Sequence, residues 1–93
     1  MIIISQDKTM ILNFEYIETI EIGNPLENND GKFKILCDTT SDNQYTIAEY
    51  KTEERAKEVL QEIIKAYREY RTAECDGYTN VLQETAVFEM PEE

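Results

Sequence analysis

Residues 52–70, TEERAKEVLQEIIKAYREY, carry the pattern that decides the fold. Apolar side chains recur there at helical spacing, and together they form one stripe along about five turns: Ala56, Val59, Leu60, Ile63, Ile64, Tyr67 and Tyr70. Thr52 is suited to cap the first turn, where Glu53 and Glu54 face the positive end of the helix dipole. The spacing predicts an amphipathic helix over residues 52–72.

Shorter segments on both sides of this helix have the apolar runs or the period of two that are typical of strands. They are Met1–Ile4, Met10–Leu12, 17–22, Lys32–Asp38 and Gln44–Tyr50 before the helix, and 86–90 after it. In Lys32–Asp38, the side chains of Phe33, Ile35 and Cys37 are expected on one face of the strand. In Gln44–Tyr50, one face is expected to hold Tyr45 and Ile47, and the opposite face Thr46, Ala48 and Tyr50. Polar turns around Asp7, Asp30 and Asp42 separate the strands, and a bend is expected near Phe14–Tyr16.

These elements predict an α+β fold in one domain spanning residues 1–93. A small antiparallel β-meander of four to five strands packs against one long helix, and the final strand returns to a sheet edge. A chain of 93 residues is long enough for one hydrophobic core and too short for two.

Composition excludes several functional classes. The net charge is −11, which opposes direct binding to nucleic acid or to an anionic membrane surface. The chain has no His, and therefore lacks the usual general base and the commonest metal ligand. We expect no enzymatic activity, no cofactor and no metal. Glu27–Gly31 resembles a calcium loop only superficially, because Cys37 stands where an EF-hand needs Glu.

The two cysteines, Cys37 and Cys75, match no metal-binding or redox spacing and are expected to be free thiols in a reducing cytoplasm. Cys37 alternates with core residues and should be buried. Cys75 follows the predicted helix, where it is expected to be exposed and to react readily with a thiol reagent. The neighbouring carboxylates raise a thiol pKa, so Cys75 is not expected to be catalytic.

The segment after the helix stripe is the predicted partner-binding site. Residues 73–93 hold six acidic and no basic residues, and aromatic side chains lie close to them. We expect Tyr70, Glu74, Asp76 and Tyr78 to contact a partner, the carboxylates by steering it and the tyrosines by anchoring it. The alternative for Tyr70 and Tyr78 is that they cap the edge of the core.

Several motifs resemble a group of short uncharacterised proteins from phages and prophages of Gram-positive gut bacteria. They are Ser5-Gln6-Asp7-Lys8, Ile11-Leu12-Asn13-Phe14, Ile20 to Ile22, Tyr50 to Ala56 and Phe88 to Glu93. The order of strands followed by one helix also resembles a pleckstrin-homology-like module, although a strand after the helix departs from that pattern. The resemblance implies a cytoplasmic, phage-encoded accessory protein.

The leading functional hypothesis is therefore a non-enzymatic, acidic protein-interaction module. It would bind and inhibit a host protein with a basic surface, one that handles nucleic acid or serves in defence. The alternatives are an oligomeric protein that sequesters or senses a small molecule between its protomers, and a structural or accessory phage protein.

Overall fold

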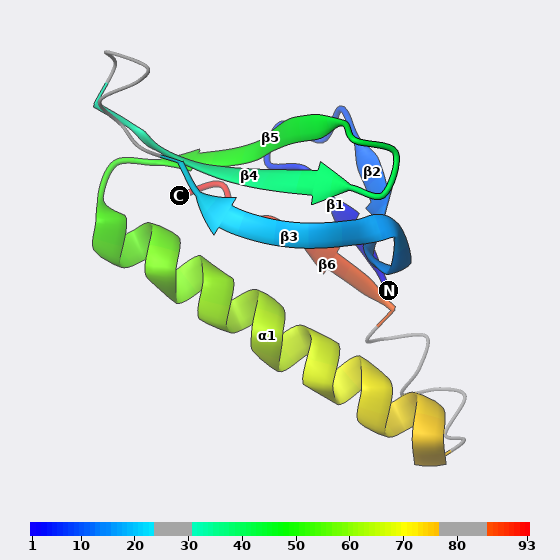
Figure 1. Cartoon of the computed structure of the whole chain (residues 1–93). Coiled ribbons are helices and arrows are strands. Elements are labelled where there is room, and N and C mark those ends of the chain that lie inside the picture. The colour runs from blue at the N-terminus through cyan, green and yellow to red at the C-terminus, as the bar shows by residue number, and fades with distance from the viewer. Residues whose placement is uncertain (24–30, 77–85) are drawn as a thin grey trace.

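The computed structural model describes residues 1–23, 31–76 and 86–93, and the side chains of all of these except 73–76. In chain order the elements are β1 (Ile2–Ile4), β2 (Ile11–Asn13), the 3-10 turn η1 (Phe14–Tyr16), β3 (Ile17–Ile22), β4 (Phe33–Thr39), β5 (Gln44–Tyr50), α1 (Glu53–Asp76) and β6 (Val87–Glu89). The α+β class, the single long helix and the final strand are confirmed (Figure 1).

The strands form two sheets of three, where the sequence suggested one meander. β3, β4 and β5 form an antiparallel sheet in that order, and α1 runs along it (Figure 1). The second sheet has the order β2-β1-β6, in which β6 lies parallel to β1. The chain passes from one sheet to the other through η1, whose first turn is capped by the Asn13 side chain accepting a hydrogen bond from the Glu15 N–H at 3.0 Å.

Both sheets and the helix contribute to one hydrophobic core. Ile3 of β1, Ile35 of β4 and Val59 of α1 are fully buried in it, as is Met90, which follows β6. Cys37 is also fully buried, which confirms its predicted position in the core. These contacts join residues from both ends of the chain, so the small second sheet is part of the same folding unit.

The helix begins where the sequence predicts and ends later. The Thr52 hydroxyl accepts a hydrogen bond from the Arg55 N–H at 3.1 Å, which confirms Thr52 as the N-cap. The predicted range of about 52–72 is one turn short, because α1 continues to Asp76. The intervening residues are compatible with a helix, and the first strong helix breaker in the sequence is Gly77.

The predicted alternation along β5 is also wrong in part. Ile35 pairs with Ala48 and Leu36 with Thr46, so Ile47 is the extra residue of a β-bulge. The bulge lets Ile47 and Ala48 both face the core, where a regular strand would expose one of them.

Some predicted features lie outside the described residues. The loop at Glu27–Asp30 and Tyr78 are among them, and so are the side chains of Glu74, Cys75 and Asp76. Gly31 is described, and its φ of +72° is the left-handed backbone that the Asp-Gly turn predicts.

Candidate protein-interaction site

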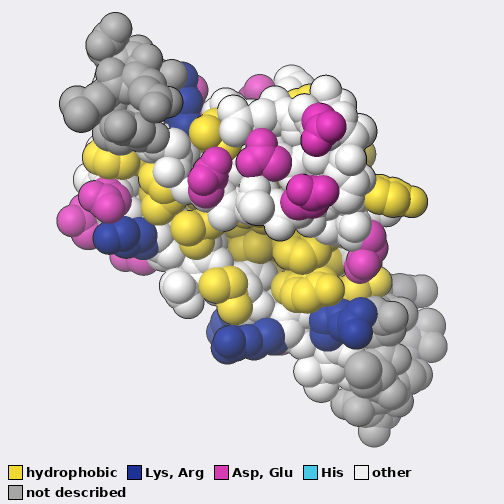
Figure 2. Space-filling model, viewed as in Figure 1, with side chains coloured by type: hydrophobic (Ala, Val, Ile, Leu, Met, Phe, Trp, Pro, Cys, Tyr) yellow, Lys and Arg dark blue, Asp and Glu magenta, His cyan; other side chains and the backbone are white. Residues whose placement is uncertain are grey.

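An apolar groove lies between the edge of the larger sheet and the helix. Its volume is about 390 Å³. Ile17 and Ile20 of β3 line one wall, and Leu60, Ile64 and Tyr67 of α1 line the other. In Figure 2 hydrophobic side chains form a band between the strands and α1. Ile64 is 42% exposed although it belongs to the helix stripe, so the groove leaves part of that stripe open to solvent.

Aromatic side chains line the end of the groove nearest the C-terminus of α1. The Phe14 and Tyr67 rings stack with centroids 4.4 Å apart, and Tyr67 stacks on Tyr70 at 6.4 Å. Tyr70 is half-buried, packs against the core and stacks on Tyr67, so this predicted partner-binding residue lies beside the groove. The side chains of the other three, Glu74, Asp76 and Tyr78, lie outside the described residues. Phe14 was not anticipated from sequence, because nothing in its local pattern indicates that η1 turns it toward the helix.

Opposite charges flank the groove. Glu18 lies in the groove wall and Glu21 is exposed on the same strand, while Lys65 and Arg68 are exposed on α1. Figure 2 shows acidic side chains over the strands and basic ones along the helix, with acidic ones also at the start of the helix. Within residues 1–23, 31–76 and 86–93, none of these four side chains has an ion-pair or hydrogen-bond partner. Their charges are therefore open to a binding partner.

The Gln6 side chain joins three parts of the chain that are far apart in sequence. Its Nε2 donates to the carbonyl oxygens of Glu49 at 2.9 Å, Pro91 at 3.2 Å and Glu92 at 2.9 Å. Its Oε1 accepts from the Glu49 N–H at 2.9 Å. The primary amide thus binds the β5 backbone as a neighbouring strand would, and it holds the last residues of the chain against β5.

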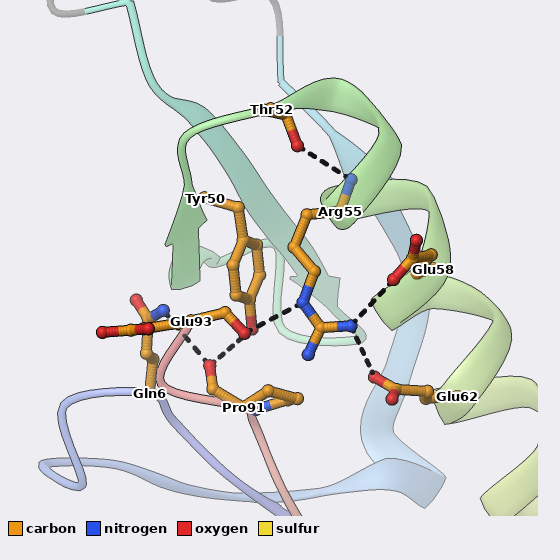
Figure 3. Close-up of polar contacts among 8 residues, drawn as sticks. All are labelled: Gln6, Tyr50, Thr52, Arg55, Glu58, Glu62, Pro91 and Glu93. Atoms are coloured by element: carbon orange, nitrogen blue, oxygen red, sulfur yellow. Dashed lines mark hydrogen bonds and ion pairs between the residues drawn. The ribbon is translucent and has the colours of Figure 1, made fainter.

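A second polar cluster surrounds the start of α1 (Figure 3). Arg55 donates to the Glu93 carbonyl at 2.9 Å and pairs with Glu58 at 3.1 Å and with Glu62 at 3.6 Å. The Tyr50 hydroxyl donates to the Pro91 carbonyl at 2.7 Å, and burial raises the pKa of Tyr50 to about 12. An open pocket of about 450 Å³ lies here, but Arg55 and Tyr50 already have partners. The cluster therefore fastens the C-terminal residues.

Cys37 and Asp7, which lie outside the groove, have shifted pKa values. Burial raises the pKa of the Cys37 thiol, which disfavours the nucleophilic thiolate. Hydrogen bonds from Thr9 and Ser5 lower the pKa of Asp7, whose carboxylate organises the turn between β1 and β2. Among the residues described, no three Cys, Asp or Glu side chains converge as metal ligands would.

In the described ranges, no helix combines the length and the hydropathy that crossing a membrane requires.

Comparisons of the chain with protein-family models, with curated proteins and with solved structures found no match. The resemblance to phage and prophage proteins and the pleckstrin-homology-like fold name remain predictions from sequence. The fold and the groove define the molecule as a small α+β domain with an open apolar site, flanked by charges that have no partner in the described part of the chain.

Proposed function

We propose that this protein is a non-enzymatic interaction module that binds another protein through the groove between β3 and α1. The observation that carries the proposal is the groove itself, where Ile64 is exposed among apolar neighbours and the charges of Glu18 and Arg68 have no partner within the described residues. Exposed apolar surface with a charged rim is typical of protein interfaces.

The charge of the whole chain bears on the kind of partner. A net charge of −11 attracts a partner with a basic surface over long range and speeds its association. A host protein that handles nucleic acid has such a surface, because it binds phosphates, and so does a defence protein that acts on nucleic acid. The resemblance to phage and prophage proteins supports the same proposal, in which the protein acts in the bacterial cytoplasm and inhibits this partner.

The experiment is affinity capture from a bacterial lysate with a pair of matched variants. Ile64 and Val87 are 42% and 44% exposed, but only Ile64 lines the groove. Ile64→Glu should abolish capture of the partner, whereas Val87→Glu should retain it. Capture should also weaken as salt rises from about 50 to 300 mM, because charge attraction is screened. A partner captured equally by both variants, or no salt-sensitive partner at all, would refute the proposal.

A further inference from the structure

The larger sheet has two edge strands, β3 and β5, and Gln6 covers part of the β5 edge. At the β5 edge, the Gln6 N–H donates to the Ile47 carbonyl at 2.8 Å. The Gln6 side chain then pairs with both the N–H and the carbonyl of Glu49. Around Ile47 and Glu49 these are backbone groups of β5 that point away from β4, so no further strand can pair with this part of β5.

The β3 edge has no such cover within the described residues. Gly23 donates its N–H to the Lys34 carbonyl at 2.8 Å, and the register continues with Glu21 opposite Leu36. Because hydrogen-bonded pairs alternate in an antiparallel ladder, the backbone groups of Ile20 and Ile22 point away from β4. They have no partner in residues 1–23, 31–76 or 86–93.

The surroundings of this open edge specify the side chains of an added strand. Its inward side chains would lie next to Ile20 and enter the apolar groove beside Leu60 and Ile64. Its outward side chains would lie next to Glu21, whose carboxylate has no described partner. A β-bulge at Glu18 interrupts regular pairing toward the start of β3, so the ladder would extend from Thr19 to Ile22.

A second copy of this chain fits the edge poorly. Pairing β3 with itself about a twofold axis would place Glu21 and its counterpart on the same face of the joined sheet. Like charges at neighbouring positions of a sheet are destabilising, and each copy carries a net charge of −11. A basic segment from a different protein meets Glu21 with favourable charge, because its basic side chains would lie on the face of the sheet away from α1 and its Lys65 and Arg68.

We infer that the partner adds an extended segment to the β3 edge, with apolar residues in the groove and Lys or Arg residues beside Glu21. This inference rests on the proposed function and specifies its binding mode. The backbone of the segment would pair with Ile20 and Ile22, and the alternation of its side chains would provide specificity.

The test uses a synthetic peptide, acetyl-Lys-Val-Arg-Ile-Lys-Val-Arg-amide, titrated into the intact protein. A control peptide of the same composition has its basic and apolar residues in separate blocks. Two further peptides carry backbone N-methyl groups on the apolar residues only or on the basic residues only. In an added strand, the N–H groups of alternate residues face β3, so one methylated peptide should bind at least about tenfold more weakly and the other nearly normally.

Protein variants give an independent measurement. Ile20→Pro and Ile20→Ala both remove the isoleucine side chain. Only proline also removes the backbone N–H that points outward, and it places its ring where an added strand would pair. Ile20→Ala should bind the peptide measurably, and Ile20→Pro should not. Thermal melts establish whether each variant is folded. If Ile20→Pro does not fold, the methylated peptides still test the inference, because they are titrated into the unchanged protein.

Each outcome decides the inference. Selective loss with one methylated peptide supports it. Equal binding of both methylated peptides, still sensitive to Ile64→Glu, overturns strand addition and leaves groove binding intact. If the block peptide binds as tightly as the alternating peptide, charge alone explains the binding and the inference is overturned. The inference is also overturned if the alternating peptide does not bind at concentrations up to about 1 mM. A dimer that Ile64→Glu dissociates would show that a second copy occupies the groove, and would also overturn it.

Discussion

Replacing Gln6 should reveal how strongly its cover of the β5 edge stabilises the fold. Gln6→Ala removes the contacts of Nε2 with three carbonyls and of Oε1 with the Glu49 N–H. The amide has two protons for its three acceptors, so one of these bonds is shared. At roughly 0.5–1 kcal/mol net for each bond in this half-buried site, the variant should lose about 2–3 kcal/mol.

This loss is large for a single polar residue in a domain of this size. With a urea slope of about 1–1.5 kcal/mol per molar, the unfolding midpoint should fall by about 2 M. The melting temperature should fall by about 10–20 °C. Gln44→Ala is the matched control, because Gln44 is exposed and its side chain donates one hydrogen bond, to Asp38 at 3.1 Å. It should stay within about 0.5 kcal/mol of the wild type.

Amide exchange tests the structural cause directly. The Glu49 N–H should exchange faster in Gln6→Ala than in the wild type, because its acceptor is gone. If Gln6→Ala unfolds at the wild-type midpoint, or if Glu49 stays protected in it, the Gln6 amide does not cover this part of the β5 edge and the contrast between the two edges is wrong.

Further predictions concern the core, the thiols and the buried tyrosine. In denaturant melts, Ile63→Ala should lower the free energy of unfolding by about 2–5 kcal/mol, because Ile63 is buried. Glu62→Ala should lower it by about 0.5 kcal/mol or less, because Glu62 is exposed. Equal losses would contradict the assigned helix face. A thiol reagent should label Cys75 in the native protein and Cys37 only after unfolding, and rapid native labelling of Cys37 would contradict its burial. Burial raises the pKa of Tyr50 from 10.0 to about 12, so folding favours the neutral phenol. The free energy of unfolding should therefore fall as the pH rises from about 10 to 12. Tyr50→Phe should remove this alkaline fall in stability, and at neutral pH it should lower the free energy of unfolding by about 1 kcal/mol. If stability still falls between about pH 10 and 12 in the variant, Tyr50 is not the group responsible.

Local patterns in the sequence determined the elements of this fold. The apolar stripe from Ala56 to Tyr70 predicted the helix, because a period of 3.6 places those residues on one face whatever they pack against. The alternation of Phe33, Ile35 and Cys37 predicted which side of β4 is buried. Thr52 marked the helix start, since capping depends on atoms only three residues apart.

Only the tertiary structure decided how these elements meet and where a partner could bind. The parallel pairing of β1 with β6, and the contacts of Gln6 with Glu49 and Pro91, join residues more than 40 positions apart. The bulge at Ile47 depends on the register against β4, which a single strand does not encode. The groove has the same origin. Ile64 reads as a core residue in the helix stripe, and it is exposed because β3 is the last strand of its sheet and nothing in the described chain continues the sheet over it.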